Sequence, residues 1–193
     1  MLNKVIEILL SAILLIPVFA VLHKSSFHSI PKTVRYFVFA VYLSAVYLFV
    51  GMPTLQFLRF EVSLTLVPFL PMITDLKNTL LNILLFVPLG ILLPFLWKRY
   101  KTLKSTCLFG FCLSLSIEVL QIFTYRATDV NDIIANTLGT LLGYLLFRVI
   151  SRLLPSVTGA AGRKNDVFVI LFSVFGVMFF LQPYLAALYY KFT

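Results

Sequence analysis

Six long apolar runs, separated by short polar segments, set the pattern of this sequence. A helix needs about 20 mainly apolar residues to cross the hydrocarbon core of a bilayer, and each run approaches that length. The pattern therefore predicts six transmembrane helices, over Ile6–Leu22, Tyr36–Met52, Asn78–Trp97, Ser105–Thr124, Asp132–Ile150 and Val167–Tyr190. We expect an all-α integral membrane protein, a polytopic bundle that forms a single transmembrane domain over residues 1–193.

The stretch between the second and third helices, Thr54–Lys77, does not fit a clean span. Besides Lys77 at its end, it carries three charged residues and two prolines: Arg59, Glu61, Asp75, Pro68 and Pro71. Its middle, Val62–Val67, alternates apolar with polar residues, which is typical of extended structure, and a proline favours extended backbone just before it. We expect a partly extended or re-entrant segment, which the membrane tolerates only where protein buries it or water reaches it.

Two further patterns concern the helices themselves. Pro88 and Gly90 lie inside the third helix and predict a kink or local unwinding there. In the fifth helix, Gly139 and Gly143 form a G-x-x-x-G motif, which favours close helix packing.

Composition supports the membrane assignment and charge gives an orientation. The chain is 61% hydrophobic and 12% charged, whereas soluble domains average about 45–50% and about 25%. Of its 16 Lys and Arg residues, 11 lie in residues 23–35, 98–104 and 148–164, at every second inter-helix segment. The positive-inside rule then predicts that both termini, the segment 54–77 and the loop after the fourth helix face outward.

The same composition argues against several function classes. The basic residues are not interleaved with exposed aromatics, so we expect membrane lipids rather than nucleic acid as their partners. Cys107 and Cys112 lack C-x-x-C spacing, and His23 and His28 lie in a basic loop, so we expect neither a metal nor a cofactor. The oligomeric state stays open.

The candidate site lies in the stretch Ser114–Gly143, which is apolar yet holds three of the seven acidic residues. Spacings of three and four residues share one helix face, so Glu118 and Gln121 lie together on the fourth helix. A second polar face continues onto the fifth helix, and Arg126 lies in the loop between them. We expect both faces to line one outward-opening cavity together with polar residues that start the third helix; the candidate binding residues are Gln121, Arg126, Asp129, Asp132, Asn136, Asn78 and Asn82.

Structural roles compete with function at most of these positions. Asp129 suits an N-cap, with Asp132 as the N3 residue favourable to the helix dipole. Arg126 suits pairing with an acid or with lipid phosphate, and the three asparagines suit hydrogen bonds between helices.

Glu118 is the hardest residue to assign to structure. Its position excludes capping, and no Lys or Arg lies within one turn of it. It is either paired across helices, with Arg126, Arg59 or Lys77, or protonated. A carboxyl group of this kind is a candidate general acid or base.

Three blocks of the sequence resemble the VanZ family of membrane proteins, which is associated with low-level teicoplanin resistance. They are the segments L-T-L-V-P-F at 64–69 and N-I-L-L-F-V-P-L-G at 82–90, and the stretch that contains E-x-x-Q, R-x-x-D-x-x-D and N-T-x-G. The resemblance covers residues 62–150. It implies a polytopic bacterial plasma-membrane protein that acts at the outer leaflet.

Two hypotheses of function follow, with transport as a third. The first is a non-enzymatic protein that binds or shields a lipid-linked cell-wall precursor or the lipid tail of a lipoglycopeptide. The alternative is a small intramembrane enzyme that modifies a lipid-linked envelope substrate. Glu118 would then be the acid or base, Asp129 and Asp132 would bind a divalent metal or a cationic group, and Arg126 would hold phosphate. Transport ranks last because no internal repeat is visible.

Overall fold

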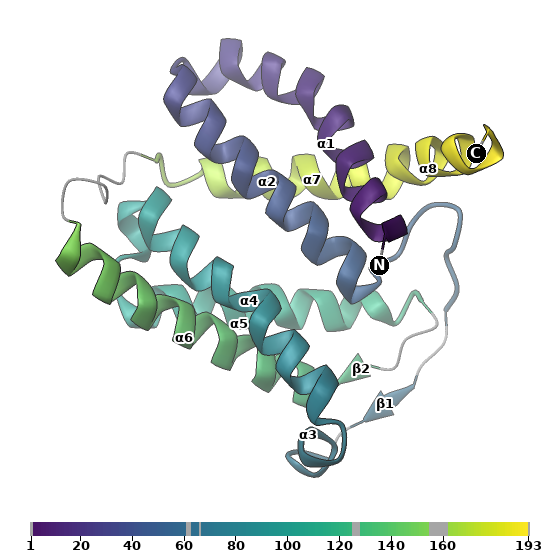
Figure 1. The fold of residues 1–193 in the computed structure, drawn as a ribbon, viewed down its shortest axis with the longest axis vertical. Helices are drawn as coiled ribbons and strands as arrows, with labels where there is room; N and C mark the ends of the chain where they lie inside the picture. Colours follow the sequence, from purple (N-terminus) through teal and green to yellow (C-terminus); the bar gives the residue numbers. More distant parts are fainter. Residues whose placement is uncertain (1, 61–62, 66, 125–127, 155–161, 193) are drawn as a thin grey trace. The chain divides into compact units, whose positions relative to one another are not determined.

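The computed structural model describes residues 2–60, 63–65, 67–124, 128–154 and 162–192. Within them, six helical stretches are long and apolar enough to cross a membrane, as predicted. Five of them are α1 (Leu2–Leu22), α2 (Ile30–Val50), α4 (Leu76–Leu96), α5 (Leu103–Gln121) and α6 (Val130–Leu153). The first, α1, continues into the π-helical turn η1 (His23–Phe27). The sixth is built from α7 (Asp166–Gly176), η4 (Val177–Leu181) and α8 (Gln182–Phe192) (Figure 1).

The chain divides into two compact units. Unit 1 comprises Met1–Leu58 and Asn165–Thr193, and so contains α1, α2 and the last span. Unit 2 comprises Arg59–Lys164 and contains α4, α5 and α6, the short helix α3 (Leu70–Thr74) and the 3-10 turn η2 (Lys98–Tyr100).

In unit 1, a buried ion pair joins the beginnings of α2 and α7. Lys32 Nζ lies 2.8 Å from Asp166 Oδ2, and the Tyr36 hydroxyl donates to the same oxygen at 2.8 Å. We expected Lys32 to lie in a loop, but α2 begins before it because Pro31 occupies the first helical turn, where its missing N–H costs nothing. The Lys32 ammonium also lies over the ring of Phe27, 5.5 Å from its centroid.

In unit 2, α4 and α6 approach each other through glycines. A Cβ atom added at Gly143 would collide with the Val87 carbonyl oxygen, and one at Gly139 would collide with the Ile83 carbonyl oxygen. The packing role predicted for the G-x-x-x-G motif is confirmed.

Of the two alternatives predicted near Pro88 and Gly90, a kink or local unwinding, the helix shows no unwinding. α4 runs as one helix through Pro88 and Pro94. Gly90 is instead a contact point, because a Cβ atom there would collide with the Thr140 carbonyl oxygen on α6.

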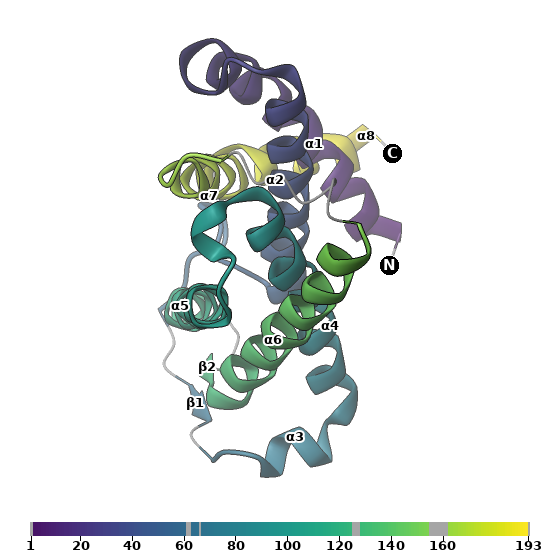
Figure 2. The same ribbon diagram turned by 90° about the vertical axis from the view of Figure 1, so that its left-hand side faces the viewer.

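The segment before α4 is extended where the sequence predicts it. β1 (Leu64–Thr65) pairs in parallel with β2 (Thr128–Asp129), and Thr128 N donates to Ser63 O at 2.8 Å. The flanking Val62 and Leu66, for which extended structure is also predicted, lie outside the described residues, as does Glu61. The two strands and α3 gather at the end of unit 2 where α6 begins (Figure 2).

Candidate functional site

The N-terminus of α6 is capped by Asp129, and a second acidic residue lies in its first turn. Asp129 is the N-cap, in extended conformation, and its Oδ1 accepts from Asn131 N at 2.8 Å. Asp132 lies in the first turn, and its Oδ1 accepts from Asn82 Nδ2 of α4 at 2.6 Å. The structural roles considered for Asp129 and Asn82, cap and interhelical hydrogen bond, are therefore both present.

Glu118 binds the connection between α5 and α6. Its side chain is 1% exposed, and its Oε2 accepts from the backbone N–H of Asp129 at 2.8 Å. Its own carbonyl oxygen accepts from the Thr128 hydroxyl at 3.0 Å. The carboxyl group thus has a backbone partner, which the spacing of charges along the sequence does not predict.

Asn131 was missed in the sequence analysis, although it makes the most telling contacts of the site. It is 4% exposed; its Nδ2 donates to Val67 O at 2.9 Å, and its Oδ1 accepts from Phe69 N at 2.8 Å. The side-chain amide of Asn131 therefore donates to and accepts from the backbone after β1, as the backbone of a neighbouring strand would. One signal was available: a polar residue between Asp129 and Asp132 at a helix start needs partners when it is buried.

The backbone that Asn131 holds is strained. Phe69 has a φ of 68°, in the left-handed region that bulky residues rarely adopt. Such a conformation costs about 1–2 kcal/mol, and the two hydrogen bonds to Asn131 offset it. Strain of this kind concentrates at functional positions.

Asn136 joins α6 to α5 deeper in the site. Its Nδ2 donates to Ser114 Oγ of α5 at 2.9 Å. Within α6, its backbone oxygen accepts from Thr140 Oγ1 at 3.0 Å. Within the described part of the chain, Asn136 Oδ1 is buried without a hydrogen-bond partner.

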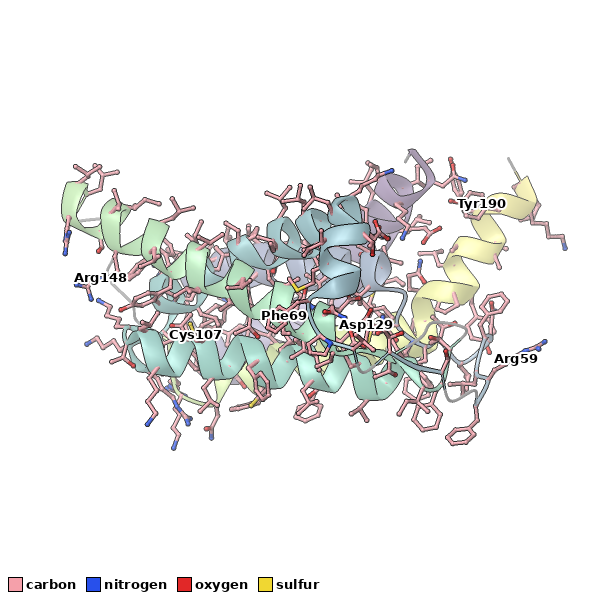
Figure 3. The ribbon with its side chains drawn as sticks, turned by 90° about the horizontal axis from the view of Figure 1, so that it is seen from below. Arg59, Phe69, Cys107, Asp129, Arg148 and Tyr190 are labelled. Atoms are coloured by element: carbon pink, nitrogen blue, oxygen red, sulfur yellow. The ribbon has the colours of Figure 1, made fainter. Side chains whose placement is uncertain are left out.

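These burials correct one expectation. Glu118, Gln121 and Asn136 are 1%, 2% and 1% exposed, so their side chains fill the interior rather than line an open cavity. The part of the site that solvent or lipid can reach is its end, where Asp129 and Asp132 are half-buried beside the segment that Asn131 holds (Figure 3).

Two expected members of the site are placed otherwise. Asn78 is exposed, and its backbone N–H donates to Asp75 Oδ1 at 3.2 Å, so it belongs to the capped start of α4. Arg126, expected at the rim, lies outside the described residues. Within the described ranges, no three His, Cys, Asp or Glu side chains are grouped so that they could hold a metal ion.

The comparisons with known proteins agree with the motifs. Protein VanZ of Enterococcus faecium is 37% identical over 86 residues, which are 44% of this chain and 52% of that protein. The chain thus spans about half the length of this curated relative. No solved structure matches.

A family model, VanZ/LLP1, matches residues 8–151, which is well over half of the chain. The match reaches α1 and α2, which lie before the motifs that first suggested the resemblance. Together with six helices that suit a membrane, it shows a multi-pass membrane protein. The chain belongs to the VanZ family.

Proposed function

We propose that this protein helps protect a bacterial envelope against a teicoplanin-type lipoglycopeptide by binding a lipid-linked or lipophilic ligand at the outer leaflet of the plasma membrane. The proposal extends to this chain the resistance associated with its family, and it is non-enzymatic. The α6 end of unit 2 would be the binding region.

One observation carries the proposal: a buried polar network holds an exposed apolar segment in a fixed, strained conformation. The exposed side chains are Val67, Phe69 and Ile73, which we call the apolar rim; they are 56%, 62% and 76% exposed. Asn131 fixes the first two through their backbone. The apolar tail of such a ligand would contact the rim, and its polar head would contact the carboxylates of Asp129 and Asp132.

The distribution of basic residues supports the proposal that the binding region faces the outside of the cell. Lys98, Arg99 and Lys101 follow α4 at the end opposite to α3, and Arg148 and Arg152 lie near the end of α6. By the positive-inside rule those ends would face the cytoplasm, and the apolar rim and both chain termini would face outward.

Expression of the full chain in a teicoplanin-sensitive bacterium tests the proposal. We expect reduced susceptibility and altered retention of a fluorescent teicoplanin by the cells. Phe69→Ser combined with Ile73→Ser should abolish both effects at normal protein level. Leu153→Ser is the matched control, because Leu153 is 74% exposed at the opposite end of unit 2. Unchanged susceptibility on expression, or equal loss in the control, would contradict the proposal.

The intramembrane enzyme is the alternative, and it depends on Glu118. The hydrogen bond from the Asp129 amide gives this carboxyl a positioning role. Glu118→Gln preserves an oxygen acceptor for that bond but cannot transfer a proton. A protein that keeps its full effect with this substitution does not use Glu118 as acid or base.

A further inference from the structure

A second candidate site lies in unit 1, between the start of α1, the end of α2 and α8. A half-open hollow of about 400 Å³ lies there, a volume within the range of small-molecule sites. Its wall is largely apolar, and its polar members include Glu7, Thr54, Gln182 and Tyr190. Tyr190 is labelled on α8 in Figure 3.

Small residues and a left-handed glycine make the space. Ala186 and Ala187 form the α8 wall, where longer side chains would fill the hollow. Gly51 ends α2 with a φ of 68° and lines the hollow, together with Met52 after it. Leu55 N then donates to Phe179 O at 3.1 Å, which fixes the segment after Gly51 against the last span.

Glu7 gives the hollow a carboxylate without a cation. Among the described residues its one hydrogen bond is a long one, 3.5 Å from the Tyr190 hydroxyl, and no ion pair to it is found. Lys4, one turn away, donates instead to Leu48 O at 2.8 Å and lies 5.0 Å from the centroid of the Phe49 ring. A carboxylate in a membrane span is costly unless it is paired.

Two further polar residues lie in the wall of the hollow. Gln182 is 3% exposed and lines it. Thr54 Oγ1 is buried and has no hydrogen-bond partner in the described part of the chain. Buried polar groups are normally hydrogen-bonded, so this unpaired hydroxyl beside the hollow points to a polar ligand.

We propose that this hollow binds an amphiphile with a primary ammonium head. The ammonium would pair with the Glu7 carboxylate, a charge-assisted hydrogen bond. The Gln182 amide and the Thr54 hydroxyl would bind other polar atoms of the head, and the apolar chain would lie against Leu48 and Ala186. The head chemistry is shared by amine-bearing phospholipids and by free alkylamines.

Native mass spectrometry of the purified full chain in neutral detergent tests the inference. The probes are phosphatidylethanolamine, phosphatidylcholine and phosphatidylglycerol in equal amounts, and dodecylamine in a separate arm. Phosphatidylcholine carries the same charges as phosphatidylethanolamine, but its quaternary ammonium cannot donate a hydrogen bond. We expect phosphatidylethanolamine to be retained roughly tenfold more than phosphatidylcholine, because one charge-assisted hydrogen bond changes a binding constant by about that factor.

The variants locate the binding. Glu7→Gln should remove the preference, and Ala187→Phe should block binding by filling the hollow. Asp75→Asn, an exposed carboxylate in unit 2, should leave binding unchanged. Retention of phosphatidylethanolamine identifies a membrane lipid as the ligand, and retention of dodecylamine alone identifies a free amine. Retention of neither, preference for phosphatidylglycerol, or an unchanged ratio in Glu7→Gln would overturn the inference.

Discussion

The Glu118 carboxylate accepts a hydrogen bond from the backbone N–H of Asp129, 11 residues later in the chain, at 2.8 Å. This contact joins the last turn of α5 to the N-cap of α6. Glu118, for which the sequence offers no structural role, therefore joins two helices; we call this hydrogen bond the α5–α6 latch. Its structural and chemical roles can be separated by substitution.

Glu118→Gln and Glu118→Ala should differ in stability. Glutamine still offers an oxygen to the Asp129 amide, whereas alanine leaves that N–H unpaired, at a cost of about 1–3 kcal/mol. We expect the free energy of unfolding, measured by dodecyl sulfate titration in mixed micelles, to fall markedly only for alanine. Equal destabilisation by both substitutions would refute the α5–α6 latch.

Gly143→Ala should destabilise unit 2. The new Cβ would collide with the Val87 carbonyl oxygen, and overpacking of this kind costs about 1–3 kcal/mol. Gly176→Ala is the control, since no atom lies within 4 Å of its added Cβ and alanine favours helix. Thermal unfolding in detergent should show a lower midpoint for the first and an equal or higher one for the second.

Asn131→Ala should release the apolar rim. The substitution removes both the donor to Val67 O and the acceptor for Phe69 N, so the amide hydrogen of Phe69 should exchange faster. Asn78→Ala, which removes an exposed amide at the start of α4, should leave that exchange unchanged. Unaltered exchange in Asn131→Ala would show that other contacts hold the rim.

Lys32 and Asp166 should show strong coupling in a double-mutant cycle. Removal of one partner leaves a buried charge and costs about 3–5 kcal/mol, whereas removal of both leaves none. Lys32→Met should therefore be more destabilising alone than together with Asp166→Asn, as measured by the free energy of unfolding. Additive effects of the two substitutions would mean that the pair contributes no coupling.

Local patterns predicted the fold well because membrane helices depend on local composition. The six spans, the extended piece at Leu64–Thr65 and the cap at Asp129 follow from runs and spacings of a few residues. The ends of helices were less predictable. Lys32 was expected in a loop because it is charged, and only its ion pair with Asp166 explains why it lies buried in a helix.

The site was predictable in its residues but not in its contacts. Glu118, Asp129, Asp132, Asn82 and Asn136 do enter hydrogen bonds at or near the start of α6. Asn131 was missed because its partner Val67 lies 64 residues away, and no periodicity reports such a contact. Burial of Glu118 and Gln121 was equally non-local, as it depends on how closely α4, α5 and α6 pack.

The parallel pairing of Leu64 with Thr128 also constrains the order of assembly. Both α4 and α5 must be made before the second strand exists, so β1 has no partner while the ribosome completes these two spans. The rim and its strained phenylalanine are then set in place only when the fifth span begins to form. A chain that stops after α5 would keep every apolar residue of the rim but would not hold Val67 and Phe69 in the conformation that Asn131 imposes.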